Sequence, residues 1–230
     1  MSNAEFLEKA FADGSKLVSG FSRPLFHNLA GIVFGRKFDK HHYGGMLRHT
    51  EAGMLYLWAR ELPPGSTVVE IGCYGGLSTS YLAAGIKGKQ GSMVYAMDPF
   101  GSDLQQQAEL TDHRVILDQK PTIDLVRQRM SEAGYGDYVT LIEGYSQNVA
   151  KEWEHPIDFL WIDGNHEQAF QDYLDFKPFL VAGARVAVHD AHPRYGYDSV
   201  VRDVRKIFAE DHEWRDLEHV KSIISGVRCG

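Results

Sequence analysis

Two short stretches of the chain place acids and histidines at spacings that suit chemistry. Asp163 and His166 are three residues apart in DGNHEQAF, and His189 and Asp190 are adjacent in VAVHDAHP. Carboxylates and an imidazole can bind Mg²⁺, Mn²⁺ or Fe²⁺, and a bound ion can lower the pKa of a hydroxyl group. An imidazole ligand makes Mn²⁺ or Fe²⁺ relatively more suitable than Mg²⁺. Asp163, His189 and Asp190 are therefore candidate metal ligands, and the alternative is a metal-free His189–Asp190 pair that orients a substrate.

His166 is the candidate general base, because a neutral imidazole can accept a hydroxyl proton near neutral pH. We expect it to begin a helix, in which one turn returns it to the side of Asp163. A capping role at the helix start is the alternative, and His189 could act as the base if no metal occupies it. Asp163, His166 and His189 are thus the candidate catalytic residues, and His192 could also line the pocket.

A glycine-rich turn follows the apolar run in VVEIGCYGGLSTSYLA, residues 68–83. Glycines let the backbone turn sharply and approach a ligand closely. Ser78 and Thr79 then place hydroxyl groups at the start of a helix, where an anion is favoured. The pattern departs from the Gly-x-Gly-x-x-Gly spacing of dinucleotide-binding turns, so it indicates a nucleotide-like ligand without selecting one.

Two further segments suit an adenosine. Asp98 ends the next expected strand, where its carboxylate could accept both ribose hydroxyls. The stretch EGYSQ, residues 143–147, ends the third strand, where an adenine edge would lie. An ordinary acid at a strand end and a plain loop are the alternative interpretations.

Together, VVEIGCYGGLS, MDPF and GYSQ resemble the class I S-adenosylmethionine-dependent methyltransferases over about residues 50–230. The similarity is greatest to small-molecule O-methyltransferases, including catechol O-methyltransferase and the metal-dependent sugar O-methyltransferases of macrolide biosynthesis. The resemblance implies that Ser78 contacts the methionine carboxylate, Asp98 the ribose, and Ser146 and Gln147 the adenine. The full set of residues implied to bind the cofactor is Glu70, Gly72, Tyr74, Gly76, Ser78, Asp98, Ser146, Gln147 and Asp163.

The resemblance also bears on the acids and histidines. The macrolide enzymes place a catalytic histidine three residues after a metal-binding aspartate, as His166 follows Asp163. The related metal-dependent enzymes have two carboxylates, or a carboxylate and an amide, where this chain has His189 and Asp190. This departure puts the metal in doubt and leaves the metal-free pair open.

These residues need a scaffold that brings strand ends together, and the pattern of the chain predicts one. Strands alternate with helices, which predicts a doubly wound α/β fold with a mostly parallel seven-stranded sheet. The last two strand-like runs have no helix between them, so we expect a C-terminal antiparallel hairpin. The expected strands are 67–72, 92–98, 139–144, 157–163 and 185–190, and the expected helices are 4–12, 77–85, 121–133, 147–153, 167–180, 198–210 and one capped by Thr50.

Composition narrows the class of protein. The 230 residues suit one domain, and 24 basic against 31 acidic residues give a net charge of −7, which argues against a nucleic-acid partner. Two cysteines and a start without basic or apolar signal regions favour the cytoplasm. No apolar stretch approaches the ~20 residues that span a bilayer, so we expect no membrane partner.

We expect residues 1–49 to form an N-terminal capping or lid segment and residues 50–230 the methyltransferase domain. Residues 20–45 and 100–120 would cover the site, His41 and His42 could belong to the lid, and the aromatic-rich N-terminal segment could form a homo-oligomer contact. The sequence thus favours methyl transfer from S-adenosylmethionine to a hydroxyl of a small molecule, a sugar or another natural product, with a possible divalent metal. The alternatives are a metal-independent N-methyltransferase, a nicotinamide-dependent oxidoreductase and a non-catalytic cofactor-binding scaffold.

Overall fold

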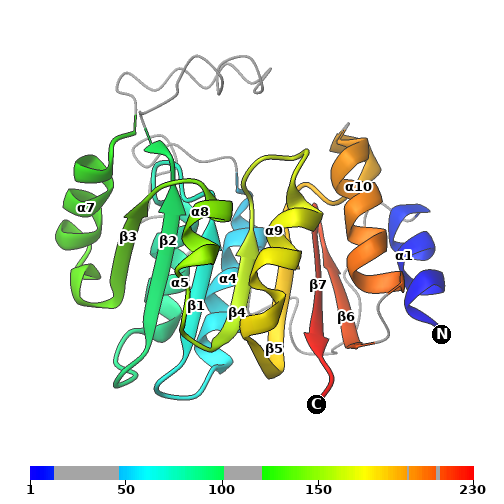
Figure 1. Ribbon diagram of the computed structural model, residues 1–230, viewed down its shortest axis with the longest axis horizontal. Coiled ribbons are helices and arrows are strands. Elements are labelled where there is room, and N and C mark those ends of the chain that lie inside the picture. The colour runs from blue at the N-terminus through cyan, green and yellow to red at the C-terminus, as the bar shows by residue number, and fades with distance from the viewer. Residues whose placement is uncertain (13–46, 101–120, 196, 211–212) are drawn as a thin grey trace.

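The computed structural model describes residues 1–12, 47–100, 121–195, 197–210 and 213–230. Its centre is a seven-stranded sheet of order β3-β2-β1-β4-β5-β7-β6 (Figure 1). The strands are β1 (Thr67–Ile71), β2 (Met93–Asp98), β3 (Val139–Glu143), β4 (Ile157–Ile162), β5 (Leu180–Val188), β6 (Trp214–Val220) and β7 (Ile223–Arg228). The predicted α/β class and strand number are confirmed.

The first five strands are parallel, and β7 pairs antiparallel with both β5 and β6. The predicted terminal hairpin is therefore confirmed, with its second strand on the inside. The strand order reverses between β1 and β4, which are direct neighbours. In open α/β sheets, ligands bind beyond the carboxyl ends of the strands at such a reversal.

Helices cover both faces of the sheet (Figure 1). The α-helices are α1 (Asn3–Ala12), α4 (His49–Glu61), α5 (Leu77–Ile86), α7 (Ile123–Glu132), α8 (Ser146–Lys151), α9 (Ala169–Phe176) and α10 (Asp198–Arg205). One core joins α4, α5 and α7 to the sheet, and a second joins α1, α9 and α10 to its other face. Successive β1 residues alternate between these cores: Val68 belongs to the first, and Val69 and Ile71 belong to the second.

Helices α4 and α5 pack against each other at Gly85, where there is no room for a side chain. A methylene at Gly85 would come within 2.6 Å of both the Ala59 Cβ and the Tyr56 carbonyl oxygen. Nearly every residue of α5 is buried as a result. This packing holds α5 in place, and the N-terminus of α5 directly follows the glycine turn.

The predicted elements are found with small shifts at their ends, except in two helices and in β5. Helix α4 begins at His49, with Arg48 rather than Thr50 as its N-cap. The predicted helix 167–180 divides into α9 and a short 3-10 turn, Lys177–Phe179, which contains Pro178. The predicted helix 198–210 ends its α-helical part at Arg205 and continues as a π-helix, Lys206–Glu210.

Strand β5 begins at Leu180, five residues before its predicted start. Ile157 of β4 pairs with Leu180 of β5, but Phe159, two residues further on, pairs with Arg185, five residues further on. The extra residues of β5 form a bulge. The bulge contains Gly183, whose φ is +80°. Glycine is common both in bulges and just after the last residue of a helix. The sequence around Gly183 therefore predicts the end of the preceding helix rather than part of a strand.

Helix α1, from the predicted 1–49 segment, packs beside β6 and α10 (Figure 1). Asn3 Nδ2 donates to the Trp214 carbonyl oxygen at 3.1 Å, and Arg205 forms a 3.0 Å ion pair with Glu8. The predicted lids, residues 20–45 and all but the first residue of 100–120, lie outside the described residues, as do His41 and His42. Within the described ranges, no helix is both long and apolar enough to span a membrane.

Candidate functional site

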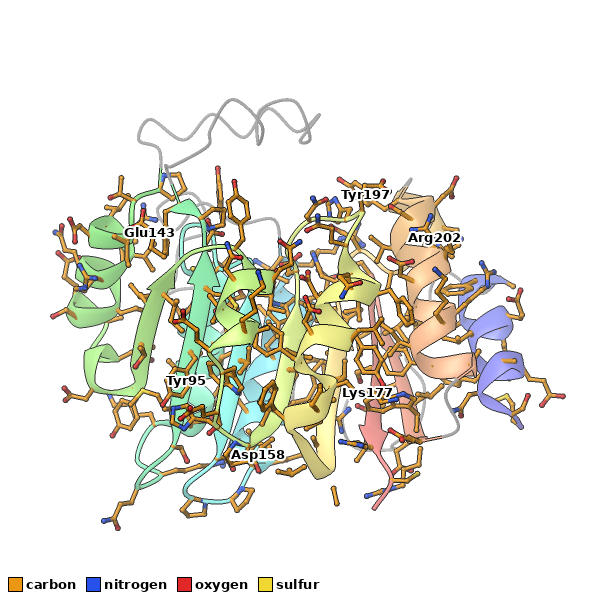
Figure 2. All side chains as sticks on the ribbon, in the orientation of Figure 1. Tyr95, Glu143, Asp158, Lys177, Tyr197 and Arg202 are labelled. Carbon is orange, nitrogen blue, oxygen red and sulfur yellow. The ribbon has the colours of Figure 1, made fainter. Side chains whose placement is uncertain are left out.

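The carboxyl ends of β1, β4 and β5 meet at one edge of the sheet. Asp163 follows β4 and donates its N–H to the Ile71 carbonyl of β1 at 2.9 Å, and His189 follows β5 and donates its N–H to Ile162 at 3.0 Å. Figure 2 labels Glu143 and Tyr197 at this end of the sheet, with Asp158 and Lys177 at the opposite end. Residues from three different strands are therefore held in register by backbone hydrogen bonds.

The glycine turn between β1 and α5 accepts no side chain at its first position. Gly72 has φ +86°, and a Cβ there would stand 2.2 Å from the Asp163 carbonyl oxygen. Gly76 also has φ +86°, and a Cβ there would lie 2.9 Å from Val126 of α7. Tyr74 lies between them with φ +44° and is exposed. The turn is thus compressed between β4 and α7, and its Tyr74 ring faces solvent.

Glu70 is fully buried at the end of β1, beneath this turn. Its carboxylate accepts hydrogen bonds from the hydroxyls of Ser78 and Thr79, the latter at 2.6 Å. Burial raises the pKa of Glu70 to about 8, and the nearby charges of Asp163 and Asp98 add to this effect. The hydroxyl of Ser78 is thus bonded to Glu70, and its expected contact with a methionine carboxylate stays a prediction.

Asp98 closes the turn from the end of β2. Its two oxygens accept the Tyr74 N–H at 2.9 Å and the Phe100 N–H at 2.7 Å. Burial raises its pKa, although both hydrogen bonds lower it. Each carboxylate oxygen has capacity for a second donor, so a pair of ribose hydroxyls fits the chemistry of this group.

The third predicted segment, after β3, directs its side chains toward α9. Ser146 donates to Asp172 at 2.6 Å, and Gln147 donates to Gln168 at 2.7 Å. Burial raises the pKa of Asp172 to about 6. The neighbouring Tyr145 has an exposed ring. Tyr145 was not among the expected ligands, and an aromatic ring next to the Ser-Gln pair was the available signal.

The acids and histidines after β4 and β5 come together. Nδ1 of His189 lies 2.9 Å from Asp163 Oδ1 and 3.4 Å from Asp190 Oδ2. One ligand atom from each of these three residues lies within 4.8 Å of the others. His189 is 6% exposed, whereas the side chains of Asp163 and Asp190 are 21% and 13% exposed, so the two carboxylates open the cluster toward solvent.

Charges in the cluster shift each other's pKa. Burial alone would lower the pKa of His189, but the surrounding carboxylates, Asp163 foremost, raise it well above its usual value. Burial raises the pKa of Asp163 against the opposing effect of His189. For Asp190, hydrogen bonds from His166 and His189 outweigh burial and hold the pKa well below its usual range.

His166 lies beside this cluster, in the turn before α9. It precedes the helix rather than beginning it, because Asn165 accepts the Glu167 N–H at 3.0 Å through its side chain and the Gln168 N–H through its carbonyl. His166 Nε2 lies 3.2 Å from Asp190 Oδ2. The ring centroids of His166 and Tyr197 are 3.8 Å apart. His166 is therefore held between a carboxylate and an aromatic ring, with a quarter of its side chain exposed.

Two residues of this region were missed from the sequence. Glu51 of α4 is buried with its carboxylate 3.8 Å from His189 Nε2. It shares the buried face of α4 with Leu55 and Trp58, and an acid at this spacing among core residues was the available signal. Tyr197 carried no such signal, because it follows a loop.

His192 has a different position from the one expected. Its ring is buried, lies 6.3 Å from Phe11 and stacks on His219 at 5.3 Å. It therefore packs between α1 and β6.

Known proteins resemble this chain in sequence pattern or in fold. A family model described as "Methyltransferase domain" matches residues 69–191. The SAH-bound methyltransferase PaMTH1 of Podospora anserina is 16% identical with a TM-score of 0.61, over 99% of this chain and 95% of that one.

Two O-methyltransferase structures match over similar lengths. TomG from Streptomyces achromogenes, involved in tomaymycin synthesis and in complex with SAM, is 16% identical with a TM-score of 0.60 over 100% of both chains. An enzyme from Bacillus cereus in complex with SAH is 15% identical with a TM-score of 0.59 over 97% of both chains. At these identities the shared property is the fold.

Proposed function

Because the chain belongs to this methyltransferase domain family and is an S-adenosylmethionine-dependent methyltransferase, we propose that it methylates a hydroxyl oxygen of a small molecule. Sugars and other hydroxylated natural products are the proposed acceptors. The observation that carries the proposal is the cluster beside the glycine turn, where His166 and two carboxylates converge. The structural neighbours named as O-methyltransferases support oxygen as the acceptor atom.

Cofactor binding is proposed at the turn and the strand ends that flank it. Asp98 would accept the ribose hydroxyls while its backbone donors hold it in place. Gly72 and Gly76 would let the backbone approach the ligand, with Tyr74 beside it. When bound, S-adenosylmethionine supplies an electrophilic methyl group on a positively charged sulfur.

His166 is the proposed general base. If its Nε2–H donates to Asp190, the Nδ1 lone pair remains to accept a proton from the acceptor hydroxyl. The Tyr197 ring, tilted by 34° against the imidazole, limits its rotation. With the cofactor bound, its sulfur would give up the methyl group to the acceptor oxygen and keep the electron pair, and His166 would accept the proton that the hydroxyl loses.

A divalent ion fits the cluster of Asp163, His189 and Asp190. Octahedral ions with ligands at about 2.1 Å need neighbouring ligand atoms about 3 Å apart. The separations from His189 Nδ1, 2.9 Å to Asp163 and 3.4 Å to Asp190, suit this requirement. An ion there would take the place of the Nδ1 proton and would polarise the acceptor hydroxyl. Without an ion, the raised pKa of His189 keeps its ring protonated, so the His189–Asp190 pair would orient the substrate.

A methyl-transfer screen tests the proposal directly. The purified protein is incubated with S-adenosylmethionine and a panel of sugars, phenols and amines, with EDTA or with added Mn²⁺. Methyl ethers formed only with Mn²⁺ would support the metal, and methyl ethers formed equally in EDTA would support the metal-free pair. Methylation of amines alone would reject the hydroxyl acceptor.

A further inference from the structure

Glu51 is a buried acid in the first turn of α4, where its side chain caps the helix by accepting the N–H of Arg48. Its side chain is 2% exposed, and its neighbours in the helix, Ala52, Met54 and Leu55, are core residues. A buried carboxylate is costly unless hydrogen bonds and charges compensate it. The groups around Glu51 therefore indicate what it does.

Three donors fix the Glu51 carboxylate. Oε1 accepts the N–H of Ser222 at 2.9 Å and the hydroxyl of Ser222 at 2.5 Å. Oε2 accepts the N–H of Arg48 at 2.8 Å. Ser222 lies in the turn between β6 and β7, so the carboxylate links the start of α4 to the terminal hairpin and cannot rotate freely.

Oε2 can accept a second hydrogen bond, and it faces the ring of His189. Nε2 of that ring lies 3.8 Å away, within ion-pair range. Nε2 is buried, and among the described residues it has no hydrogen-bond partner. The opposite nitrogen, Nδ1, faces Asp163 and Asp190. If the His189 ring were flipped, carbon atoms would face Glu51 and Asp163 where nitrogen atoms now do. Glu51 and Asp163 therefore favour the same ring orientation.

We propose that Glu51 is a positioning residue, which holds Nε2 of His189 in its protonated form so that Nδ1 is presented to Asp163 and Asp190. This inference rests on the proposed metal site. It adds to that site a residue from α4, which lies more than a hundred positions before Asp163, His189 and Asp190 in the sequence. A ligand histidine commonly donates its second N–H to a carboxylate, which fixes the tautomer and makes the ligating nitrogen more basic.

Glu51→Gln is the variant that tests the role. It keeps the side-chain volume and an oxygen for Ser222, and it replaces the charge facing Nε2 by an amide. Ser222→Ala is the matched control, because it removes a donor from the same carboxylate on the side away from His189. Glu51→Asp, which keeps the charge but draws it back by one methylene, replaces Glu51→Gln if that variant does not fold.

The primary measurement is binding of Mn²⁺ alone to cofactor-free protein, read from the paramagnetic resonance signal of the free ion. Glu51→Gln should weaken binding by about 10–100-fold, the usual effect of removing such a partner. Ser222→Ala should change it by less than about threefold, because Glu51 keeps its charge facing Nε2 and the backbone N–H of residue 222 still holds the carboxylate. Equal affinities in wild type and Glu51→Gln would overturn the proposal.

The second measurement separates failure of Glu51 from failure of the proposed metal site. If the wild type binds no Mn²⁺, the metal is rejected, and nitrogen chemical shifts of His189 in the metal-free protein decide the role of Glu51. A change at Nε2 in Glu51→Gln but not in Ser222→Ala would support positioning. The same shifts in both variants and the wild type would overturn it. Neither measurement depends on finding the methyl acceptor.

Discussion

Glu70→Gln should make the protein more stable in alkaline solution, although it removes two hydrogen bonds to a carboxylate. Burial raises the pKa of Glu70 from 4.5 to about 8, so the folded protein keeps this proton at pH values where the unfolded chain has lost it. A group with a raised pKa contributes stability that is complete below 4.5 and is lost as the pH rises through about 8. Glutamine does not ionise, so residue 70 of the variant adds no pH dependence to the stability.

The magnitude follows from the two pKa values. Each pKa unit corresponds to 1.36 kcal/mol, and linkage between pH 5 and pH 9 then gives a loss of about 4 kcal/mol for wild type. Near pH 5 the two proteins should differ by no more than about 1 kcal/mol, because the hydroxyls of Ser78 and Thr79 can donate to or accept from an amide. At pH 9 the variant should be the more stable by several kcal/mol.

Urea unfolding at pH 5, 7 and 9 measures this difference directly. Asp163, Asp172 and the other shifted groups titrate in both proteins, so their effects cancel to first order. Glu154→Gln, a change of an exposed acid, controls for the loss of one negative charge. A stability difference between wild type and Glu70→Gln that stays constant from pH 5 to pH 9 would refute the burial argument, because it would mean that folding does not alter the ionisation of Glu70.

Three further outcomes are expected. Asp98→Ala should weaken S-adenosylhomocysteine binding in calorimetry by about 1.5–3 kcal/mol, the scale of charge-assisted hydrogen bonds, and unchanged affinity would remove Asp98 from the ribose site. His166→Ala should lower kcat by about 10²–10⁴-fold and leave S-adenosylhomocysteine affinity nearly unchanged, whereas near-normal kcat would rule out His166 as the base. Gly72→Ala should unfold in less urea than Gly88→Ala, because both glycines have positive φ but only the first would drive a Cβ into the Asp163 backbone; equal losses would show that φ strain alone matters.

The sheet was predictable because its information is local. Runs such as TVVEI and IDFLWI are buried on both faces of a parallel sheet, and their ends carry Gly72, Asp98 and Asp163. Strand ends of a parallel sheet share one edge, so adjacency of Asp163 and His189 also followed from strand order. The start of β5 was missed, because the bulge around Gly183 depends on pairing with β4 rather than on the local pattern.

Side-chain direction and long-range partners were not predictable in the same way. Glu51 reaches Ser222 and His189 only because α4 packs under the terminal hairpin, and no local pattern encodes that contact. Ser146 lies where the sequence placed it, but its hydroxyl is bonded to Asp172 of a neighbouring helix. The turn of Asn165 likewise displaced His166 from its expected place at the start of α9.

The position of β7 has a consequence for the order in which the protein can assemble. A ribosome makes β6 before β7, yet β6 joins the sheet only through β7. Until β7 emerges, the edge of β5 stays open and can pair with another nascent chain, which is a known hazard of exposed strand edges. Helix α1, although it precedes the other described elements, must wait as well, because its partner Trp214 belongs to β6. We therefore expect α1 and the terminal hairpin, which lie far apart in the sequence, to dock together.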